Sequence, residues 1–280
     1  MRKISYQIIV DKVSELCINA NYELGQDVVN AFKEAVKIER SEIGRDVLNQ
    51  LIANAEIAAS ERVPMCQDTG VAVFIVEVGQ DIHIEGGTLN DAINEGVKKG
   101  YLEGYLRNSI VSHPLERKNT GDNTPAIIHI EFVPGNQLKI MMTAKGGGAE
   151  NMSRMKMLKP SDGIEGVKDF IIETVRNAGP NACPPLVVGV GIGGNFEYCS
   201  YLAKKALFRE VGKRSKPPEI SALEVELLEE MNQLGIGPQG YGGSTTALDV
   251  KIEIAACHIA ALPVAVNLNC HASRHKEAVL

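Results

Sequence analysis

The sequence predicts an α+β fold, in which a helical N-terminal part is followed by mixed strands and helices. The first supporting observation is that apolar residues recur with a helical period from residue 4 to residue 60. The second is that strand-like and helix-like segments then mix without strict strand–helix–strand alternation, which disfavours a doubly wound sheet. The 280 residues contain no repeat and no long linker, so we expect a single domain over residues 1–280.

The N-terminal helical region, residues 4–60, is expected to break at Gly25 and at Ser41. From Val71 the periodicity changes, and the valine-rich run VAVFIVEVG predicts a strand. The region between the helices and this strand, PMCQDTG, is therefore expected to be a loop held by rigid neighbours. Such loops commonly carry functional side chains.

In the middle of the chain, Thr88 followed by Asp91 is typical of a capped helix start. We expect this helix to run through residues 91–107. Two strand-like runs, 126–133 and 138–144, are separated by the turn sequence PGNQ. This spacing predicts a β-hairpin.

Later in the chain, Ser161 is expected to cap a helix over residues 163–178, which Gly179 and Pro180 end. The remaining elements are predicted from apolar runs and their flanking turns. They are a strand starting at Leu186, helices over 196–208 and 221–234, and strands over 247–260 and 262–269.

The bulk composition excludes several classes of function. The formal net charge of −6 argues against a nucleic-acid-binding surface, and no apolar run is long enough to span a bilayer. The charged N-terminal segment is typical of an amphipathic helix and not of a signal peptide. We therefore expect a cytoplasmic protein, in which disulfides are not expected.

Six cysteines are present, and no two are arranged as CxxC, so a zinc ribbon or finger is not supported. Three of them lie inside apolar patterns and are expected to be core residues: Cys17, Cys199 and Cys257. The other three lie in turn-like contexts next to strand-like runs: Cys66, Cys183 and Cys270. Only a folded chain could bring these three together.

Three glycine-rich stretches allow more than one interpretation, and GIGPQGYGG, from Gly235, has the same alternatives as KGGGAEN. KGGGAEN, from Lys145, is either a flexible turn or a backbone that offers N–H groups to an anion. Gly189, Gly191 and Gly194 fit the dinucleotide-binding pattern G-x-G-x-x-G, and Glu210 lies at about the distance of a ribose-binding acid. No strand is expected between the following helix and RSKPPE, so the strand–helix–strand context of a dinucleotide-binding module is missing.

A second alternative makes Cys66 a nucleophile, with His271 or His113 as its base. This would leave Cys183, in its proline-flanked turn, without a role. The third interpretation is an iron–sulfur cluster held by Cys66, Cys183 and Cys270. Clusters usually take four cysteines, so three would leave one iron open as a Lewis acid for removing a hydroxyl group. Asp68 is in position to move the proton.

Six motifs in this order resemble the class I, iron–sulfur fumarate hydratases, and the resemblance is closest to the separate α subunit of their two-subunit form. It extends from about residue 40 to the C-terminus, and the iron–sulfur L-tartrate dehydratase α subunit is similar over the same stretches. The motifs are CQDTG, NTGDNTPA, KGGGAEN, NACPP, GIGG and NCHASR.

The resemblance implies a 4Fe–4S cluster on Cys66, Cys183 and Cys270, with Asp68 in acid–base work. It also implies that a C4 dicarboxylate substrate contacts Gln67, Asp68, Arg107 and Gly148. The expected reaction is the hydration of fumarate to (S)-malate, as in the tricarboxylic acid cycle, with dehydration of L-tartrate as the alternative. Single-chain members of the family continue into a second domain with further binding groups. A separate β subunit is therefore expected to complete the site, in an α2β2 assembly.

Overall fold

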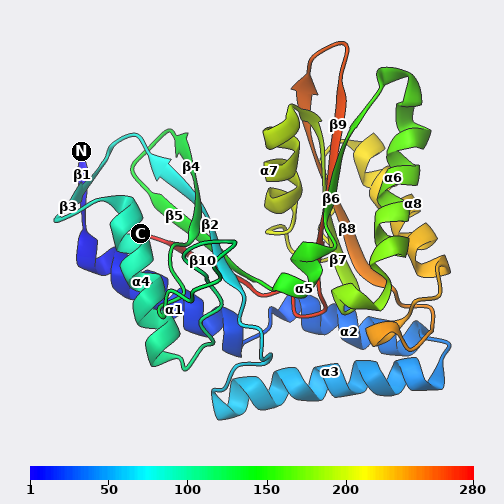
Figure 1. Cartoon of the computed structure of the whole chain (residues 1–280), viewed down its shortest axis with the longest axis horizontal. Helices are drawn as coiled ribbons and strands as arrows, with labels where there is room; N and C mark the ends of the chain where they lie inside the picture. Colours follow the sequence, from blue (N-terminus) through cyan, green and yellow to red (C-terminus); the bar gives the residue numbers. More distant parts are fainter. The chain divides into compact units, whose positions relative to one another are not determined.

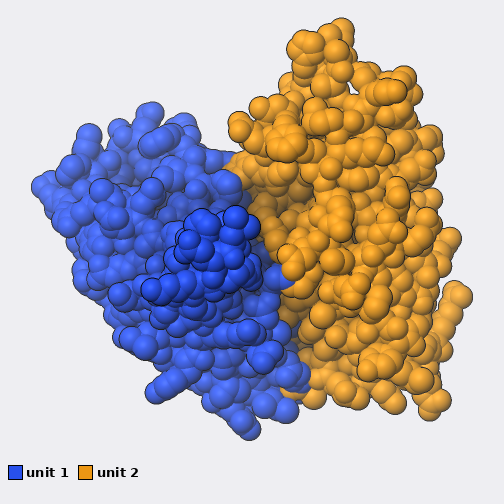
Figure 2. All heavy atoms as spheres, in the orientation of Figure 1, with its two compact units in different colours: residues 1–25, 54–147, 274–280 blue, residues 26–53, 148–273 orange.

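The computed structural model describes residues 1–280, and it confirms the α+β class: helices lead, and mixed sheets follow (Figure 1). The chain divides into two compact units, coloured in Figure 2. Unit 1 comprises residues 1–25, 54–147 and 274–280, and unit 2 comprises residues 26–53 and 148–273. The sequence did not predict this division into two units. That residues 1–280 form a single domain remains a prediction.

Unit 1 contains a four-stranded sheet of order β10-β5-β2-β4, in which only the β2–β4 pair is parallel. A separate parallel pair joins β1 to β3. The elements are β1 (Arg2–Ser5), α1 (Tyr6–Tyr22), β2 (Val71–Gly79), β3 (Ile82–Glu85), α4 (Leu89–Glu103), β4 (Ile127–Val133), β5 (Leu138–Lys145) and β10 (His275–Val279). The core of this unit lies between α1, α4 and the sheet.

The predicted hairpin of residues 126–133 and 138–144 is wrong. β4 and β5 do form, but β2 lies between them and pairs with both. The physical reason is burial: residues 72–76 of β2 are all buried, and the middle of a sheet is the place where a strand loses most contact with water. A local turn signal therefore did not decide which strands pair.

Two helix boundaries in unit 1 also differ from expectation. Residues 2–5 form a strand, and α1 starts at Tyr6 because the Ser5 hydroxyl caps it by accepting from the Ile8 N–H. The Thr88 cap is confirmed, since its hydroxyl accepts from the Asp91 N–H at 3.1 Å. That helix, α4, ends at Glu103, so residues 104–107 lie outside it.

Unit 2 is built on a sheet of order β6-β9-β7-β8, with α7 on one side and α6 and α8 on the other (Figure 1). β7 is parallel to β8 and antiparallel to β9. The elements are α2 (Gln26–Ile38), α5 (Gly147–Asn151, starting in unit 1), β6 (Arg154–Leu158), α6 (Gly163–Ala178), β7 (Leu186–Gly194), α7 (Phe196–Ala206), α8 (Pro218–Gln233), β8 (Ala247–Cys257) and β9 (Leu262–Asn269). The helix α3 (Glu42–Glu61) begins in unit 2 and ends in unit 1.

The G-x-G-x-x-G glycines allow close packing. All three lie within β7 and not in a turn that could cradle phosphate. A side chain at Gly189 would collide with the backbone of Ala203, and one at Gly191 with the backbone of Cys199, so both glycines let α7 approach the strand. The sequence pattern did not reveal that a strand parallel to β7 exists, because β8 follows only after α7 and α8.

Two further expectations in unit 2 are wrong. Ser161 lies in a short 3-10 turn, and α6 begins after Asp162 without a side-chain cap. Cys257 is exposed at the end of β8, where the chain turns toward β9. Cys17 and Cys199 are buried as expected. No helix in the structure combines the length and the apolar character that a transmembrane span needs.

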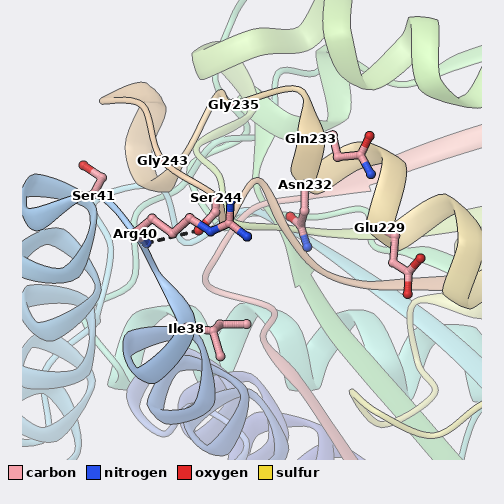
Figure 3. A pocket seen from close by; sticks show the side chains of 9 residues that line it. All are labelled: Ile38, Arg40, Ser41, Glu229, Asn232, Gln233, Gly235, Gly243 and Ser244. Atoms are coloured by element: carbon pink, nitrogen blue, oxygen red, sulfur yellow. Dashed lines mark hydrogen bonds between the residues drawn. The ribbon is translucent and has the colours of Figure 1, made fainter.

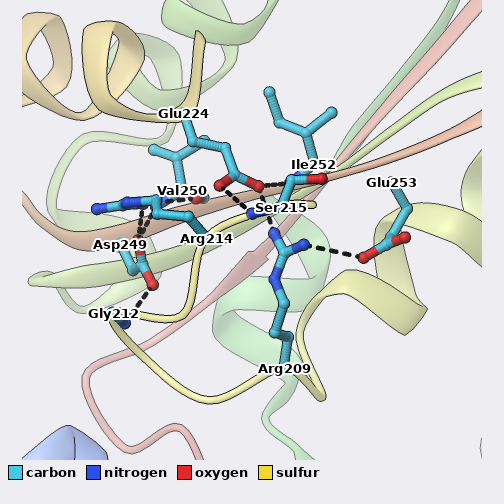
Figure 4. Close-up of polar contacts among 9 residues, drawn as sticks. All are labelled: Arg209, Gly212, Arg214, Ser215, Glu224, Asp249, Val250, Ile252 and Glu253. Carbon is cyan, nitrogen blue, oxygen red and sulfur yellow. Dashed lines mark hydrogen bonds and ion pairs between the residues drawn. The ribbon is translucent and has the colours of Figure 1, made fainter. Parts of the chain in front are cut away.

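Two buried carboxylates tie the loop of residues 209–215 to the sheet of unit 2 (Figure 4). Glu224 of α8 forms an ion pair with Arg209 and accepts from the backbone N–H of Ser215 at 2.9 Å. Asp249 of β8 forms an ion pair with Arg214. Because both carboxylates are fully buried, each needs its cation, and removing one partner alone is expected to destabilise the unit.

Glu39, just after α2, is another buried carboxylate, with 2% of its surface exposed. Its oxygens accept hydrogen bonds from the backbone N–H groups of Ser41, Ser244 and Thr245 and from the Ser244 hydroxyl. Burial by itself raises the pKa of a carboxyl group, but these hydrogen bonds outweigh it and lower the pKa of Glu39 to about 2.

Glu39→Gln is therefore expected to lower the free energy of unfolding at pH 7 by about 3 kcal/mol. Since the folded pKa is below the ordinary value of 4.5, this stabilisation is complete above pH 4.5 and is lost as the pH falls toward 2. Urea unfolding of both proteins at pH 7 and pH 3 measures it. The control is Glu34→Gln, an exposed partner of Lys37, expected to cost under ~1 kcal/mol. Equal stability of the wild type and Glu39→Gln at pH 7 would contradict the prediction.

Candidate active site

The CQDTG loop, residues 66–70, connects α3 to β2 in unit 1. Its central side chain, Asp68, is half-buried and accepts a backbone hydrogen bond on each carboxylate oxygen. Oδ1 accepts from the Gly70 N–H at 2.9 Å, and Oδ2 accepts from the Gly147 N–H at 2.7 Å. Asp68 is therefore held in one orientation by the backbone. One of the N–H groups that KGGGAEN could offer to an anion, that of Gly147, is donated to Asp68 itself.

The backbone of this loop is fixed by side chains from distant parts of unit 1. The Tyr101 hydroxyl contacts the carbonyl oxygens of Thr69 and Gly70 at 2.9 and 3.0 Å. Asn123 donates to the Gly70 carbonyl at 3.1 Å. Gly70 itself adopts φ +75°, and a Cβ there would lie 2.7 Å from the Lys145 carbonyl oxygen. Sequence reasoning missed Tyr101 and Asn123, although Asn123 belongs to the motif NTGDNTPA.

Arg107 lies in the segment attached to the CQDTG loop, because its carbonyl accepts a hydrogen bond from the Thr69 hydroxyl at 3.0 Å. It is exposed and follows α4, outside the helix in which we expected it. Gln67 is also exposed. Unit 1 thus presents four of the predicted site residues: Cys66, Gln67, Asp68 and Arg107.

Unit 2 brings together the segments that carry the other two cysteines. The backbone N–H of His271, next to Cys270, donates to the Cys183 carbonyl at 3.1 Å. Gln239, from the glycine-dense stretch 235–245, contacts both sides: its amide lies 3.0 Å from His271 Nδ1 and donates to the Pro184 carbonyl at 2.7 Å. Cys183 adopts φ +54°, in the left-handed region.

Gly148 lies close to the segment of unit 2 that carries Cys183, since a Cβ at Gly148 would be 3.5 Å from the Asn181 carbonyl oxygen. It therefore lies beside the NACPP motif. The predicted cluster ligands are thus divided, with Cys66 in unit 1 and Cys183 and Cys270 in unit 2. The structure shows no group of three or more His, Cys, Asp or Glu side chains placed to hold a metal ion.

The chemistry of the donor set fits an iron–sulfur cluster. Cys66 and Cys270 are half-buried, Cys183 is exposed, and none is tied up in a disulfide. Metal ligation needs the thiolate. Burial raises the pKa of the Cys17 and Cys199 thiols, which makes these two poorer ligands.

The nucleophile alternative finds no support in unit 1. No hydrogen bond joins Cys66 to His113, whose Nδ1 instead accepts from the backbone N–H of Glu116 at 3.2 Å. His271 lies in unit 2, where its Nδ1 contacts Gln239.

A pocket of about 870 Å³ opens in unit 2 beside the Glu39 contacts, and Figure 3 shows Arg40 and Ser244 side by side within it. None of the residues predicted for the site lines this pocket. Its lining residues are Ile38, Arg40, Ser41, Glu229, Asn232, Gln233, Gly235, Gly243 and Ser244.

A family model described as "Fumarate hydratase (Fumerase)" matches residues 10–279. The chain belongs to the fumarate hydratase family. The family resemblance of the six motifs is thereby confirmed, and the match begins about thirty residues earlier than the motifs indicated. Membership of this family also removes the basis for the alternative in which the chain is a dinucleotide-binding module.

Individual members of the family are similar over nearly the whole chain. A protein of Methanocaldococcus jannaschii named "Putative L(+)-tartrate dehydratase subunit alpha" is 50% identical over 273 residues, covering 95% of each chain. The L(+)-tartrate dehydratase subunit alpha of Escherichia coli K12 is 34% identical over 282 residues, covering 98% of this chain and 92% of the relative. The protein of the same name from E. coli UTI89 is 34% identical over 281 residues, with the same coverage.

Proposed function

We propose that this chain is the α subunit of an iron–sulfur hydro-lyase that dehydrates L-tartrate. The observation that supports the choice of substrate is the 50% identity, over 95% of the chain, to a relative named for tartrate. The sequence alone led us to prefer fumarate hydration, with tartrate as the alternative, and the relatives' names favour the alternative. Both reactions belong to the hydro-lyase chemistry of the family.

The cofactor of this proposal is a 4Fe–4S cluster held by Cys66, Cys183 and Cys270. When bound, it would supply a Lewis-acidic iron, which makes hydroxide a better leaving group. The support from the structure is the set of three thiols that are at least partly accessible and not in disulfides, two of them on segments joined by the His271–Cys183 hydrogen bond.

The proposed role of Asp68 is to move the proton. Dehydration removes a proton from one carbon and a hydroxyl group from the next, so a base must be held close to the first carbon. Backbone N–H groups orient both oxygens of Asp68, and the side chain stays partly accessible. Each oxygen keeps a second lone pair for a substrate proton.

Gln67, Arg107 and Gly148 are proposed to bind the C4 dicarboxylate. Arg107 is exposed and tied through its carbonyl to the loop that carries Asp68, and a guanidinium fits a two-oxygen carboxylate. Gln67 follows Cys66 directly and is also exposed. Gly148 would contact the substrate through its backbone.

The partner in this proposal is a separate β subunit, since the relatives are named as α subunits. A dicarboxylate has two anionic ends, and each needs a counter-charge when it leaves water. Arg107 supplies one, and the β subunit would supply the other and complete the site. We propose an α2β2 assembly located in the cytoplasm.

The test is co-expression of this chain with its β subunit, anaerobic purification, and measurement of turnover of L-tartrate and of fumarate by the complex. A kcat/KM for L-tartrate at least about tenfold above that for fumarate is expected. The reverse order would assign the chain to fumarate hydration. A complex that turns over neither substrate would disprove the proposed function. This chain purified alone, with its iron present, is expected to be inactive. Full activity of the chain alone would show that the site does not need the β subunit.

A further inference from the structure

Arg274, in the motif NCHASRH, is almost completely buried, with 1% of its surface exposed. Its Nη1 donates to the Asn21 side-chain oxygen at 2.9 Å and to the backbone carbonyl of Asp68 at 2.7 Å. No carboxylate forms an ion pair with it. Burying a guanidinium without a paired carboxylate is unfavourable for stability, so stability alone does not account for an arginine at this position.

The backbone of Arg274 is anchored to the strand that leads into KGGGAEN. Its carbonyl accepts from the Thr143 hydroxyl at 2.7 Å and from the Ala144 N–H at 3.2 Å, just before β10 pairs with β5. Three residues after Ala144, Gly147 donates its N–H to the Asp68 carboxylate. Arg274 is thus fixed to the same strand end that orients the Asp68 side chain.

The guanidinium and the Asp68 carboxylate also both lie close to Gly146. A Cβ built on Gly146 would be 3.3 Å from Asp68 Oδ2 and 3.5 Å from Arg274 Nη2. The two charged groups therefore adjoin one small space, which the glycine leaves open. One arginine contacts the backbone of Asp68, the helix α1 through Asn21, and the strand β5.

We propose that Arg274 is a positioning residue, which holds the CQDTG loop so that the Asp68 carboxylate stays on the N–H groups of Gly70 and Gly147. The part of this inference that concerns turnover rests on the proposed role of Asp68. Lysine is not expected to replace arginine here. Both hydrogen bonds come from Nη1, which the rigid guanidinium plane holds in place, whereas a lysine ammonium is a point charge on a flexible stem. Hydrogen exchange at the Gly70 and Gly147 amides reports on this positioning without any measurement of turnover.

The test measures amide hydrogen exchange at Gly70 and Gly147 in the full chain, comparing the wild type with Arg274→Lys. We expect both amides to exchange at least about tenfold faster in the variant. Asp68→Ala provides the reference for an amide without its carboxylate acceptor. Asn21→Ala, which removes one acceptor of the guanidinium and keeps the arginine, is expected to give a smaller increase and serves if Arg274→Lys does not fold.

The matched control is Arg214→Lys, because Arg214 is an ion-paired arginine of unit 2. It is expected to lower thermal stability and to leave exchange at Gly70 and Gly147 unchanged. In the complex with the β subunit, Arg274→Lys is expected to lower kcat about a hundredfold, with KM changed less than about threefold, because a displaced base costs rate and not binding.

Unchanged exchange at both glycines in Arg274→Lys and in Asn21→Ala would overturn the inference. So would a loss of exchange protection throughout unit 1, which would make Arg274 a residue of general stability. If the wild-type complex turns over neither dicarboxylate, the proposed function fails, while the exchange experiment still decides whether Arg274 positions Asp68.

Discussion

Asp68→Asn is expected to lower the kcat of the reconstituted complex by at least about a hundredfold, the scale of a lost general acid–base group. The amide cannot take up or return a proton at neutral pH. It also places an NH₂ group where Asp68 now offers an oxygen to the N–H of Gly70 or Gly147, so one backbone donor loses its acceptor. The iron content should remain that of the wild type, because no proposed cluster ligand is changed.

The control for this variant is Asp81→Asn, which removes an exposed carboxylate from the β2–β3 turn of the same unit. Its kcat should equal that of the wild type. Steady-state kinetics and iron determination on both variants check the prediction. A kcat for Asp68→Asn within about threefold of the wild type would show that Asp68 does not move the proton.

Replacing any one of Cys66, Cys183 or Cys270 with Ser is expected to abolish the visible colour and nearly all the iron of anaerobically purified protein. Three cysteines are fewer than the four that clusters usually take, so none is dispensable. Because the proposed cluster would leave one iron without a protein ligand, the wild-type protein should also lose activity in air.

The controls for the ligand set are the other three cysteines, and the structure ranks them. Cys257→Ser is the cleanest, because Cys257 is exposed at the end of β8. Cys17 and Cys199 are fully buried, so their replacement also costs packing, and stability must be measured beside iron. Retention of iron by all three Cys66, Cys183 and Cys270 variants would disprove the assignment.

Local signals in the sequence predicted individual elements well. The Thr88 cap, the end of α6 before Gly179 and the strands β8 and β9 were all found, because each depends on neighbouring residues alone. The sequence signals did not predict which strands pair with each other. The turn PGNQ resembles a hairpin turn, yet β2 inserts between the two strands it connects, and only the burial of β2 in the folded unit explains this.

The candidate site shows the same limit. From their residue types in turn-like contexts, the sequence predicted Cys66, Asp68, Cys183 and Cys270 as site residues, and this stays a prediction. The sequence could not show that Asp68 is held by Gly147, because that hydrogen bond joins residues 79 positions apart. The packing of α7 on the glycines of β7 was also missed, because a glycine pattern does not reveal which element packs against it.

The discontinuity of unit 1 determines the order in which a growing chain can complete its parts. Unit 2 is whole once residue 273 has been synthesised, whereas unit 1, which starts with residue 1, still lacks β10 and Arg274. Until then β5 has a free edge, and the CQDTG loop lacks the contact of an arginine 206 positions after Asp68. Unit 1, whose residues 1–25 are made before any part of unit 2, is therefore completed after it, and unit 1 carries the proposed base.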